Sequence, residues 1–296
     1  MKYLRVLIRC VIFSALVIFI LCGCSSKPKN KGEIFALRNR AENMLALGNR
    51  EASRGNYENA HAIFLESKRN AVLSDDPSAI IRCSLSLANN LYSLGRVDEA
   101  FIEWEKAVAE AENSKNTELL SVTRIFLARG RLFSGRTPAA SVLEEVNRNQ
   151  GYIKTDRLYI AFSWQVKALA QRALGAYSDA ENSIRNSLEI HEKDMYLENA
   201  SYDWYTLASI RSLAGNTQGA LTALSSAILI DRRIENSWGL AASWRAVGDV
   251  SRKAGREKEA LEAYSRARAI YEAIGNDFET AQIDQRMNQT TEDNNE

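Results

Sequence analysis

Residues 243–267, SWRAVGDVSRKAGREKEALEAYSRA, contain the pattern that decides the fold. Gly255 stands between two stretches rich in helix-forming residues, with Gly248 seven positions before it and Ala260 five positions after it. The same spacing recurs every 40 residues, with the central glycine at Gly55, Gly95, Gly135, Gly175, Gly215 and Gly255. A fixed period of this length indicates a stacked array of helical hairpins, in which each unit packs only on its neighbours.

Small residues recur at two further positions of each unit. Five residues after the glycine the chain carries Ala60, Ala100, Ala140, Ala180, Ala220 and Ala260. Seven residues before it stand Gly48, Ala88, Ala128, Ala168, Ala208 and Gly248. Because small side chains let two helices cross closely, each glycine is expected to lie in the turn between two packed helices.

Helix-capping residues recur near the end of the units, at Asp76, Asn116, Asp156, Asn236 and Asn276. Their side chains can accept hydrogen bonds from the free N–H groups of a following helix. Tyr196 breaks this pattern at its fourth position. Each unit is therefore predicted to run helix, glycine turn, helix and cap, with helices at about residues 77–94 and 97–113 in the second unit.

These residues resemble the tetratricopeptide repeat family. Its units carry an aromatic and a small residue in the first helix, often a glycine in the turn, and an alanine, an aromatic and a small residue in the second helix. The sixth unit supplies Trp244, Gly248, Gly255, Ala260, Tyr264 and Ala267, and the first supplies Gly48, Gly55, Tyr57, Ala60, Phe64 and Ser67. The resemblance covers about residues 35–275 and implies an all-α fold, a right-handed α-solenoid of about six helix-turn-helix repeats.

Two features depart from the family pattern. The period is 40 residues instead of about 34, so the helices are expected to be longer. The proline that usually closes each unit is absent, and the Asp and Asn caps take its place. Trp164, Trp204 and Trp244 occupy the aromatic position of the last three units and are expected in the core. One further helix, at residues 278–287, is expected to cap the last unit.

The first 24 residues resemble a bacterial lipoprotein signal. A basic region holding Lys2, Arg5 and Arg9 precedes an apolar run, residues 11–21, that is too short to span a bilayer comfortably. The following residues, 21–24 (LCGC), resemble a lipobox. The resemblance implies cleavage before Cys24 and lipidation of that residue.

This signal also bears on location and domain organisation. An uncleaved signal anchor at residues 4–21 is the alternative to cleavage. Ser25, directly after the cysteine, favours the outer membrane in bacteria with conventional sorting. The predicted division is a signal peptide at 1–23, a lipidated cysteine and flexible tether at 24–34, the solenoid at 35–288, and a disordered polar tail at 289–296.

Composition and motifs offer no catalytic chemistry. The net charge of +1 gives no reason to expect nucleic acid as a partner. His61 and His191 lack partners at metal-ligand spacing, and no phosphate-binding, dinucleotide or nucleophile motif is present. Cys83 lies among apolar residues, so a buried structural thiol is expected. The sequence therefore predicts a protein that is not an enzyme and uses neither cofactor nor metal.

The first helix of each unit is expected to line a concave groove, as in the family that the chain resembles. The candidate groove residues share positions that the family uses for contact: Arg82, Asn89, Tyr92, Arg129, Phe162, Arg172, Tyr202, Tyr205, Arg245 and Arg252. The first-helix windows (41–54 and every 40 residues onward) hold twelve basic and four acidic residues, a net +8. The second-helix windows hold fifteen basic and twenty acidic residues, a net −5.

This segregation predicts a basic, aromatic-lined groove for a protein or peptide partner with acidic and apolar groups. The alternative is that the arginines pair with acids on neighbouring helices. Leu45 and Val122 stand where the family's carboxylate clamp needs polar or basic residues, so recognition of a free C-terminus is not expected.

The third unit departs from the others. Glu144 replaces its aromatic residue, Asn147 its small residue, and Pro138 opens its second helix. That helix is expected to end early and to leave a looser joint. A hinge or docking loop and plain repeat degeneracy are both open readings.

The sequence thus predicts a lipid-anchored scaffold or adaptor of the bacterial cell envelope. A surface-exposed adhesin and an accessory ligand-binding subunit of a transport system are the alternatives. The sequence does not decide whether the chain forms a homo-oligomer.

Overall fold

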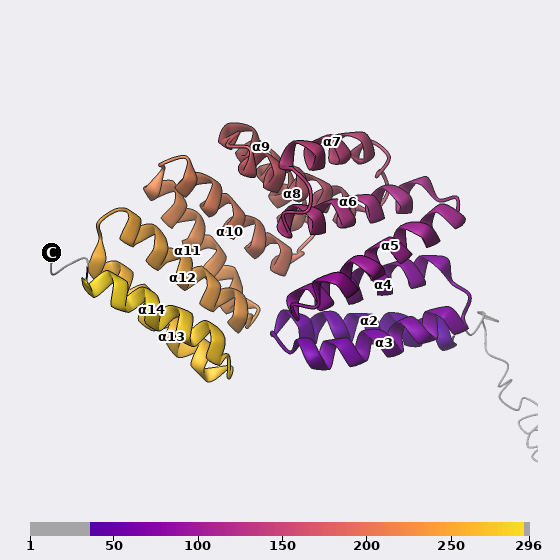
Figure 1. Ribbon diagram of the computed structural model, residues 1–296, viewed down its shortest axis with the longest axis horizontal. Helices are drawn as coiled ribbons and strands as arrows, with labels where there is room; N and C mark the ends of the chain where they lie inside the picture. Colours follow the sequence, from indigo (N-terminus) through magenta and orange to yellow (C-terminus); the bar gives the residue numbers. More distant parts are fainter. Residues whose placement is uncertain (1–35, 293–296) are drawn as a thin grey trace, which may run out of the picture. The chain divides into compact units, whose positions relative to one another are not determined.

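The computed structural model describes residues 36–292, and these residues form thirteen α-helices arranged as successive hairpins (Figure 1). The predicted signal peptide, Cys24 and the tether lie outside the described residues, so those predictions are untested. Within the described range, no helix combines the length and the apolar character that crossing a membrane requires.

Each unit contributes two helices, and an additional helix follows the sixth unit. The first helices are α2 (Ala36–Ser53), α4 (Pro77–Ser93), α6 (Thr117–Phe133), α8 (Arg157–Ala173), α10 (Leu197–Leu213) and α12 (Ser237–Lys253). The second helices are α3 (Tyr57–Leu73), α5 (Val97–Asn113), α7 (Ala139–Gln150), α9 (Tyr177–Lys193), α11 (Thr217–Arg233) and α13 (Glu257–Ala273). The last helix is α14 (Asp277–Glu292). The predicted solenoid of six helix-turn-helix units with a capping helix is confirmed.

The turns between paired helices depend on glycine. All six periodic glycines have positive φ angles, from 68° at Gly135 to 82° at Gly55 and Gly215. A side chain is strained in this region, so the 40-residue glycine period follows from the turn geometry. The connections between units also use positive φ, but at the non-glycine residues Asp75, Lys115, Met195 and Glu235. The sequence pattern did not reveal these four positions.

The predicted caps are present at the starts of the first helices. Asp76 accepts a hydrogen bond from the Ala79 N–H at 3.1 Å, and Asn236 accepts one from the Gly239 N–H at 3.0 Å. Asn116, Asp156 and Asn276 cap their helices in the same way. Tyr196, the expected exception, makes no side-chain cap. The starts of α4, α6, α8, α12 and α14 are therefore encoded locally, and the start of α10 is the exception.

The core lies between the paired helices and continues from one unit to the next. The predicted aromatic positions are filled by Phe64, Trp104 and Tyr264, each at most 1% exposed. A methyl group added at Gly48 would lie 2.6 Å from Phe64, and one at Gly248 would lie 2.4 Å from Tyr264. Small residues are thus required where these helices cross. Cys83 is buried, as predicted, with its Sγ 3.1 Å from the Ser67 hydroxyl.

The tryptophans only partly follow the prediction of core positions. Trp104 is 1% exposed, but Trp164, Trp204 and Trp244 are half-buried. Trp204 donates a hydrogen bond to Glu192 at 2.9 Å, and the guanidinium of Arg266 lies 4.7 Å from the ring centroid of Trp244. These indoles are therefore placed where one side meets polar groups at the surface.

The third unit has a different register from its neighbours. Its second helix, α7, ends at Gln150 and is shorter than the others, as predicted. Ala140 is exposed, and Val142 and Val146 fill the interior instead. The unit therefore keeps the turn glycine but shifts the buried face of its second helix, because Pro138 delays the start of that helix.

The loop after α7 is held in place, in contrast to the predicted looser joint. One carboxylate oxygen of Glu118 accepts hydrogen bonds from the N–H groups of Lys154 at 2.9 Å and Thr155 at 2.8 Å. The other oxygen accepts a hydrogen bond from the Thr155 hydroxyl at 2.8 Å. The shortened helix is thus compensated by a contact to α6.

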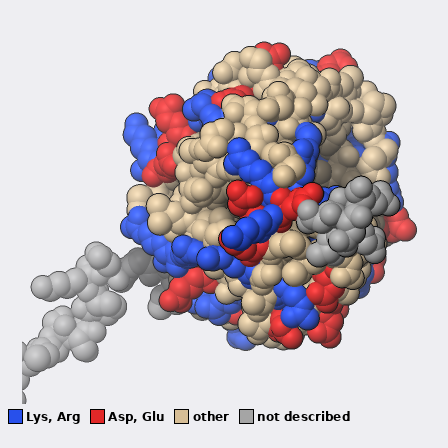
Figure 2. Space-filling view, turned by 90° about the vertical axis from the view of Figure 1, so that its left-hand side faces the viewer, with Lys and Arg blue, Asp and Glu red and all other residues tan. Residues whose placement is uncertain are grey.

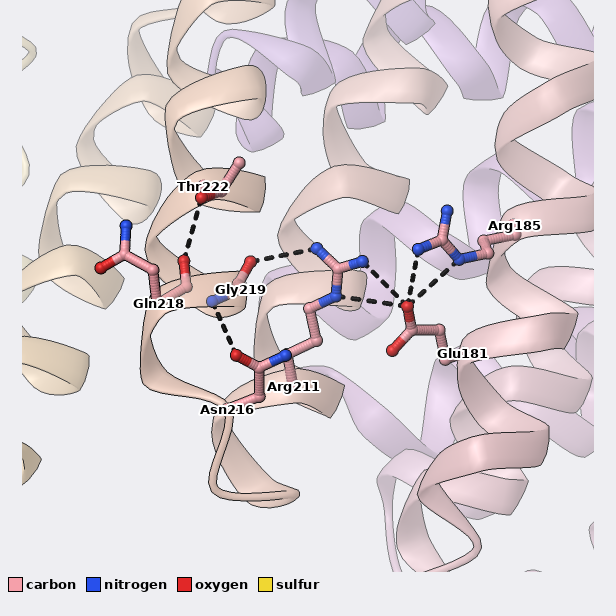
Figure 3. A network of polar contacts seen from close by, with 7 residues as sticks. All are labelled: Glu181, Arg185, Arg211, Asn216, Gln218, Gly219 and Thr222. Atoms are coloured by element: carbon pink, nitrogen blue, oxygen red, sulfur yellow. Dashed lines mark hydrogen bonds and ion pairs between the residues drawn. The ribbon is translucent and has the colours of Figure 1, made fainter.

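A polar network joins the fourth and fifth units (Figure 3). Glu181 of α9 accepts hydrogen bonds from Arg185 at 2.7 Å and from Arg211 of α10 at 2.8 Å. Arg211 also donates to the Gly219 carbonyl of α11 at 3.1 Å. Glu181 and Arg211 together therefore connect three successive helices, α9, α10 and α11, in addition to the apolar packing between them.

The helix expected at residues 278–287 is present and longer than predicted. It begins at Asp277 and continues to Glu292, so residues 289–292, which were assigned to the polar tail, are helical. Its Ile283 is fully buried in the same cluster as Tyr264 and Tyr271. The helix therefore covers the apolar face of the sixth unit, the role predicted for a cap.

Candidate functional site

All ten candidate groove residues lie on the first helices of units two to six, and bonds between successive first helices join several of them. Arg82 of α4 pairs with Glu42 of α2, and Arg129 of α6 donates to Asn89 of α4 at 2.8 Å. Arg172 of α8 donates to the Ser209 hydroxyl of α10 at 3.1 Å. The first helices thus form one continuous layer, which is called the groove face below.

All five groove arginines have side-chain partners, and for two of them the partner is an acid. Arg82 is paired with Glu42, and Arg245 forms an ion pair with Glu279 at 2.7 Å. Arg252 donates to the Gln289 side chain at 3.2 Å. The alternative prediction, that arginines pair with acids on neighbouring helices, therefore holds for Arg82 and Arg245.

Arg129 is held differently, by aromatic rings and an amide. Its guanidinium lies 5.0 Å from the ring centroid of Phe162 and 5.4 Å from that of Phe126. The two rings are themselves stacked with centroids 4.0 Å apart. Its buried Nε has no hydrogen-bond partner within the described range, and burial lowers the pKa of Arg129. This cation has aromatic and amide neighbours but no ion pair within residues 36–292.

Tyr202 lies close to Arg129 and Arg172. Burial raises the pKa of the Tyr202 hydroxyl, and both arginines act in the opposite direction. The residue is nevertheless 41% exposed, and its ring stacks on that of Tyr205 with centroids 6.4 Å apart. Arg129, Phe162, Arg172, Tyr202 and Tyr205 are called the central groove cluster below. Cationic and aromatic groups in this arrangement suit a carboxylate next to an apolar side chain.

The first unit meets the fifth and sixth units, which the sequence did not predict. Tyr57 and Trp238 make an edge-to-face contact with ring centroids 5.9 Å apart. A cavity of about 960 Å³ lies at this junction, between the end of α2 and the loops before α10 and α12. A second cavity of about 320 Å³ continues from it along the groove face. The junction and these cavities are called the seam, the outer cavity and the inner pocket below.

One buried cluster has the residue types of a catalytic triad but not its geometry. The Ser187 hydroxyl donates to Asp203 Oδ2 at 2.7 Å, and His191 Nδ1 lies 2.7 Å from the same oxygen. In a nucleophilic triad the imidazole lies between the hydroxyl and the carboxylate. Here Asp203 is central, and all three side chains are at most 1% exposed. The cluster is therefore structural, and it joins α9 to α10.

The charges on the surface are mixed. Figure 2 shows lysines and arginines interspersed with aspartates and glutamates on the face that it draws, which agrees with the net charge of +1. Within the described range, no group of three or more His, Cys, Asp or Glu side chains could hold a metal ion. The overall charge therefore does not indicate a partner, and the side chains of the groove face are the features to consider for partner binding.

No protein-family model and no curated protein matches this sequence. Among solved structures, the chain is similar to a Rap protein complexed with Competence and Sporulation Factor, with a TM-score of 0.59, 18% identity, and coverage of 86% of this chain and 71% of that chain. It is also similar to PH0952 of Pyrococcus horikoshii, a signal transduction ATPase with a tetratricopeptide repeat sensor, with a TM-score of 0.56 and 16% identity. That match covers 79% of this chain and 37% of PH0952.

A third similar structure is TTC0263 of Thermus thermophilus, described as a thermophilic tetratricopeptide repeat protein. Its TM-score is 0.50, its identity 21%, and the match covers 71% of this chain and 98% of that chain. The described residues therefore have the fold of tetratricopeptide repeat proteins, as the sequence resemblance implied.

Proposed function

We propose that this chain is a scaffold that binds a protein or peptide segment along its groove face. A carboxylate of the partner binds Arg129 and Arg172, and an adjacent apolar side chain packs on Phe162 and Tyr202. The observation that carries this proposal is the environment of Arg129, a half-buried cation whose Nε has no hydrogen-bond partner and which has no acidic partner within the described range.

A half-buried charge without a counter-ion is unfavourable for stability, since water no longer solvates it fully and no carboxylate compensates it. The neighbouring rings of Phe126 and Phe162 offset part of this free-energy cost through cation–π contact with the guanidinium. A partner carboxylate would complete the arrangement, and a guanidinium can bind it in a bidentate manner.

The comparison with solved structures supports binding as the general role. The similar Rap protein was crystallised in complex with Competence and Sporulation Factor, so a member of this fold accommodates a bound factor. The central groove cluster extends this to a specific chemistry for the present chain, an acidic and apolar segment.

The proposal is tested by peptide display on the purified full-length chain. Selected peptides are expected to be enriched in Asp or Glu beside an aromatic or large aliphatic residue. The double variant Arg129→Gln with Arg172→Gln should lose at least roughly 90% of this binding, as about two lost charge-assisted contacts predict. The matched control, Arg233→Gln with Arg256→Gln, removes two exposed arginines from other surfaces.

Equal binding by the two double variants would refute the role of the central groove cluster. Circular dichroism of each variant separates this outcome from unfolding, because both are expected to keep the helical content of the native chain.

We further propose that the scaffold is attached to the bacterial cell envelope through a lipid on Cys24. The support is the sequence alone: the basic region, the short apolar run and the lipobox at residues 21–24. Labelled palmitate should be incorporated into the native chain and not into Cys24→Ser, which should also leave the membrane fraction. Retention of the label in Cys24→Ser would contradict lipidation at this residue.

Protease treatment of intact cells then separates a periplasmic adaptor from the surface-exposed adhesin.

A further inference from the structure

The inner pocket at the seam has a charge opposite to that expected for the groove. Its lining residues include the acidic Glu198 and Asp231 and the aromatic Tyr202, Tyr205 and Trp238. Arg245, the cation among its described lining residues, already pairs with Glu279 at 2.7 Å. The balance of formal charge over these lining residues is therefore negative.

The environment of Asp231, besides the negative charge of the pocket lining, indicates a bound cation. The residue is 1% exposed, and its Oδ1 accepts a hydrogen bond from Asn236 at 2.9 Å. Within the described range its buried Oδ2 has no hydrogen bond of standard geometry, and the hydroxyls of Ser201 and Ser243 lie near enough to lower the pKa that burial raises. A buried carboxyl oxygen without a hydrogen bond is unfavourable, and a cation in the pocket would lower that cost.

The aromatic side chains complete a site of defined chemistry. Tyr202 and Tyr205 stack on each other, and Tyr202 is 41% exposed, so its ring is open to the groove. The indole of Trp238 forms another part of the wall and makes an edge-to-face contact with Tyr271 at 5.6 Å. Aromatic faces beside a carboxylate are suited to a cation with an apolar stem. The volume of about 320 Å³ is at the lower end of the range for ligand pockets.

We propose that the inner pocket binds an alkylammonium or guanidinium group on an apolar stem, as in a lysine or arginine side chain of the bound segment. The stem packs against Tyr202, Tyr205 and Trp238, and the charge lies toward Glu198 and Asp231. This inference rests on the proposed binding function and adds a second subsite to it.

The two subsites share Tyr202. This tyrosine lies near Arg129 and Arg172 and also lines the inner pocket. A bound segment would therefore carry an acidic group and a basic group that both lie near the Tyr202–Tyr205 stack. Such an arrangement would also fix the direction of the segment along the groove face.

The test is a titration of the full-length chain with capped lysine (N-acetyl-lysine N-methylamide), followed by ligand-observed NMR. Capped norleucine is the neutral comparison, since it has an apolar stem but no ammonium group. Capped lysine is expected to bind at least tenfold more tightly than capped norleucine. Glu198→Gln and Asp231→Asn should each weaken capped lysine at least fivefold. Glu235→Gln is the matched control, because Glu235 lines the outer cavity but not the inner pocket.

Two results would overturn the inference: equal affinity for capped lysine and capped norleucine, or an equal loss of affinity in Glu235→Gln and Asp231→Asn. A titration with butylammonium distinguishes a site for free amines from a site for a lysine side chain of a peptide. Binding as tight as that of capped lysine identifies a site for free amines, and weaker binding identifies a site that also needs the peptide backbone.

The outcome also separates this inference from the proposed function. If capped lysine fails to bind while acidic peptides still depend on Arg129, the second subsite is wrong and the scaffold role stands. If neither ligand binds, both proposals fail.

Discussion

Gly130 in α6 shows how much of the fold depends on single small residues. A methyl group at this position would lie 2.3 Å from Cζ3 of Trp104, whose side chain is 1% exposed. Neither the indole nor the helix backbone has room to move, because both are enclosed by neighbouring helices. The aromatic residue of the second unit is thus accommodated only because the third unit provides a glycine.

Gly130→Ala is therefore expected to destabilise the protein by about 1–3 kcal/mol, the usual range for overpacking. The control is Gly151→Ala, where an added methyl group meets nothing within 4 Å. Urea unfolding monitored by circular dichroism measures both variants. A similar midpoint for the two variants would show that the crossing of α5 and α6 tolerates more volume than the structure indicates.

Asp231 links stability to the proposed second subsite. Burial raises the pKa of its carboxyl group, so the folded chain binds this proton more tightly than the unfolded chain. The free energy of unfolding therefore falls as pH rises from the ordinary carboxyl range through the raised pKa. At neutral pH the buried carboxylate is a source of instability, which is a common property of binding sites.

Asp231→Asn is expected to raise the free energy of unfolding at pH 7 by about 1 kcal/mol, because it removes the buried charge and keeps the hydrogen bond from Asn236. The gain should disappear as the pH approaches about 4, where the native carboxyl group is also neutral. Thermal melts at a series of pH values measure this difference. A variant that is less stable than the native chain at pH 7 would contradict the assignment of Asp231 as an unfavourable buried charge.

At the scale of secondary structure, Glu118 of α6 holds the loop that follows the short helix α7. Burial opposes the charge of its carboxylate, but hydrogen bonds from Thr155, Lys154 and Asp156 outweigh this and lower its pKa. The group therefore contributes stability that is present above the ordinary carboxyl pKa and is lost as pH falls through the lowered value.

Glu118→Ala should release the loop at residues 151–156 and lower the unfolding free energy by about 1–2 kcal/mol, at the low end for hydrogen bonds to a charged acceptor because Glu118 is only half-buried. Hydrogen exchange at the Lys154 and Thr155 amides should accelerate, while exchange in α10 stays unchanged. Glu112→Ala, which removes another acid that contacts α6, is the control. Unchanged exchange in the loop would mean that Glu118 does not hold it, and would support the looser joint that the sequence predicted.

The sequence predicts the elements well because their determinants are local. A turn that needs positive φ explains the glycine at position 255, and a cap that accepts an N–H explains Asn236. The exposed Ala140 was not foreseen, because it follows from the delayed start of α7 rather than from the 40-residue period. The pairing of Arg82 with Glu42 joins residues 40 positions apart and depends on how adjacent units stack.

At the scale of the whole described array, the seam is the feature that no local pattern could predict. It depends on the rotation accumulated over all intervening units, which no single motif determines. The edge-to-face contact between Tyr57 of the first unit and Trp238 of the sixth closes it. Each aromatic pair is worth only about 0.5–1.5 kcal/mol beyond its buried area, so the seam should open easily.

Trp238→Ala is therefore expected to separate the first and sixth units without loss of helical content. Small-angle X-ray scattering should show a larger radius of gyration for this variant. Trp244→Ala is the control, because that indole contacts Arg232 and Arg266 rather than the first unit. An unchanged radius of gyration in Trp238→Ala would mean that the stacking of the units alone holds the seam closed.

The central claim, that partners bind along the groove face, is tested most directly by site-specific photo-crosslinking. A benzophenone amino acid replaces Tyr202 in one variant and Leu229, which is 69% exposed on α11, in another. The account predicts that a peptide selected on the native chain crosslinks at position 202 and not at position 229, and that excess unlabelled peptide competes for the crosslink. Crosslinking at position 229 alone would place the binding surface elsewhere and contradict the account.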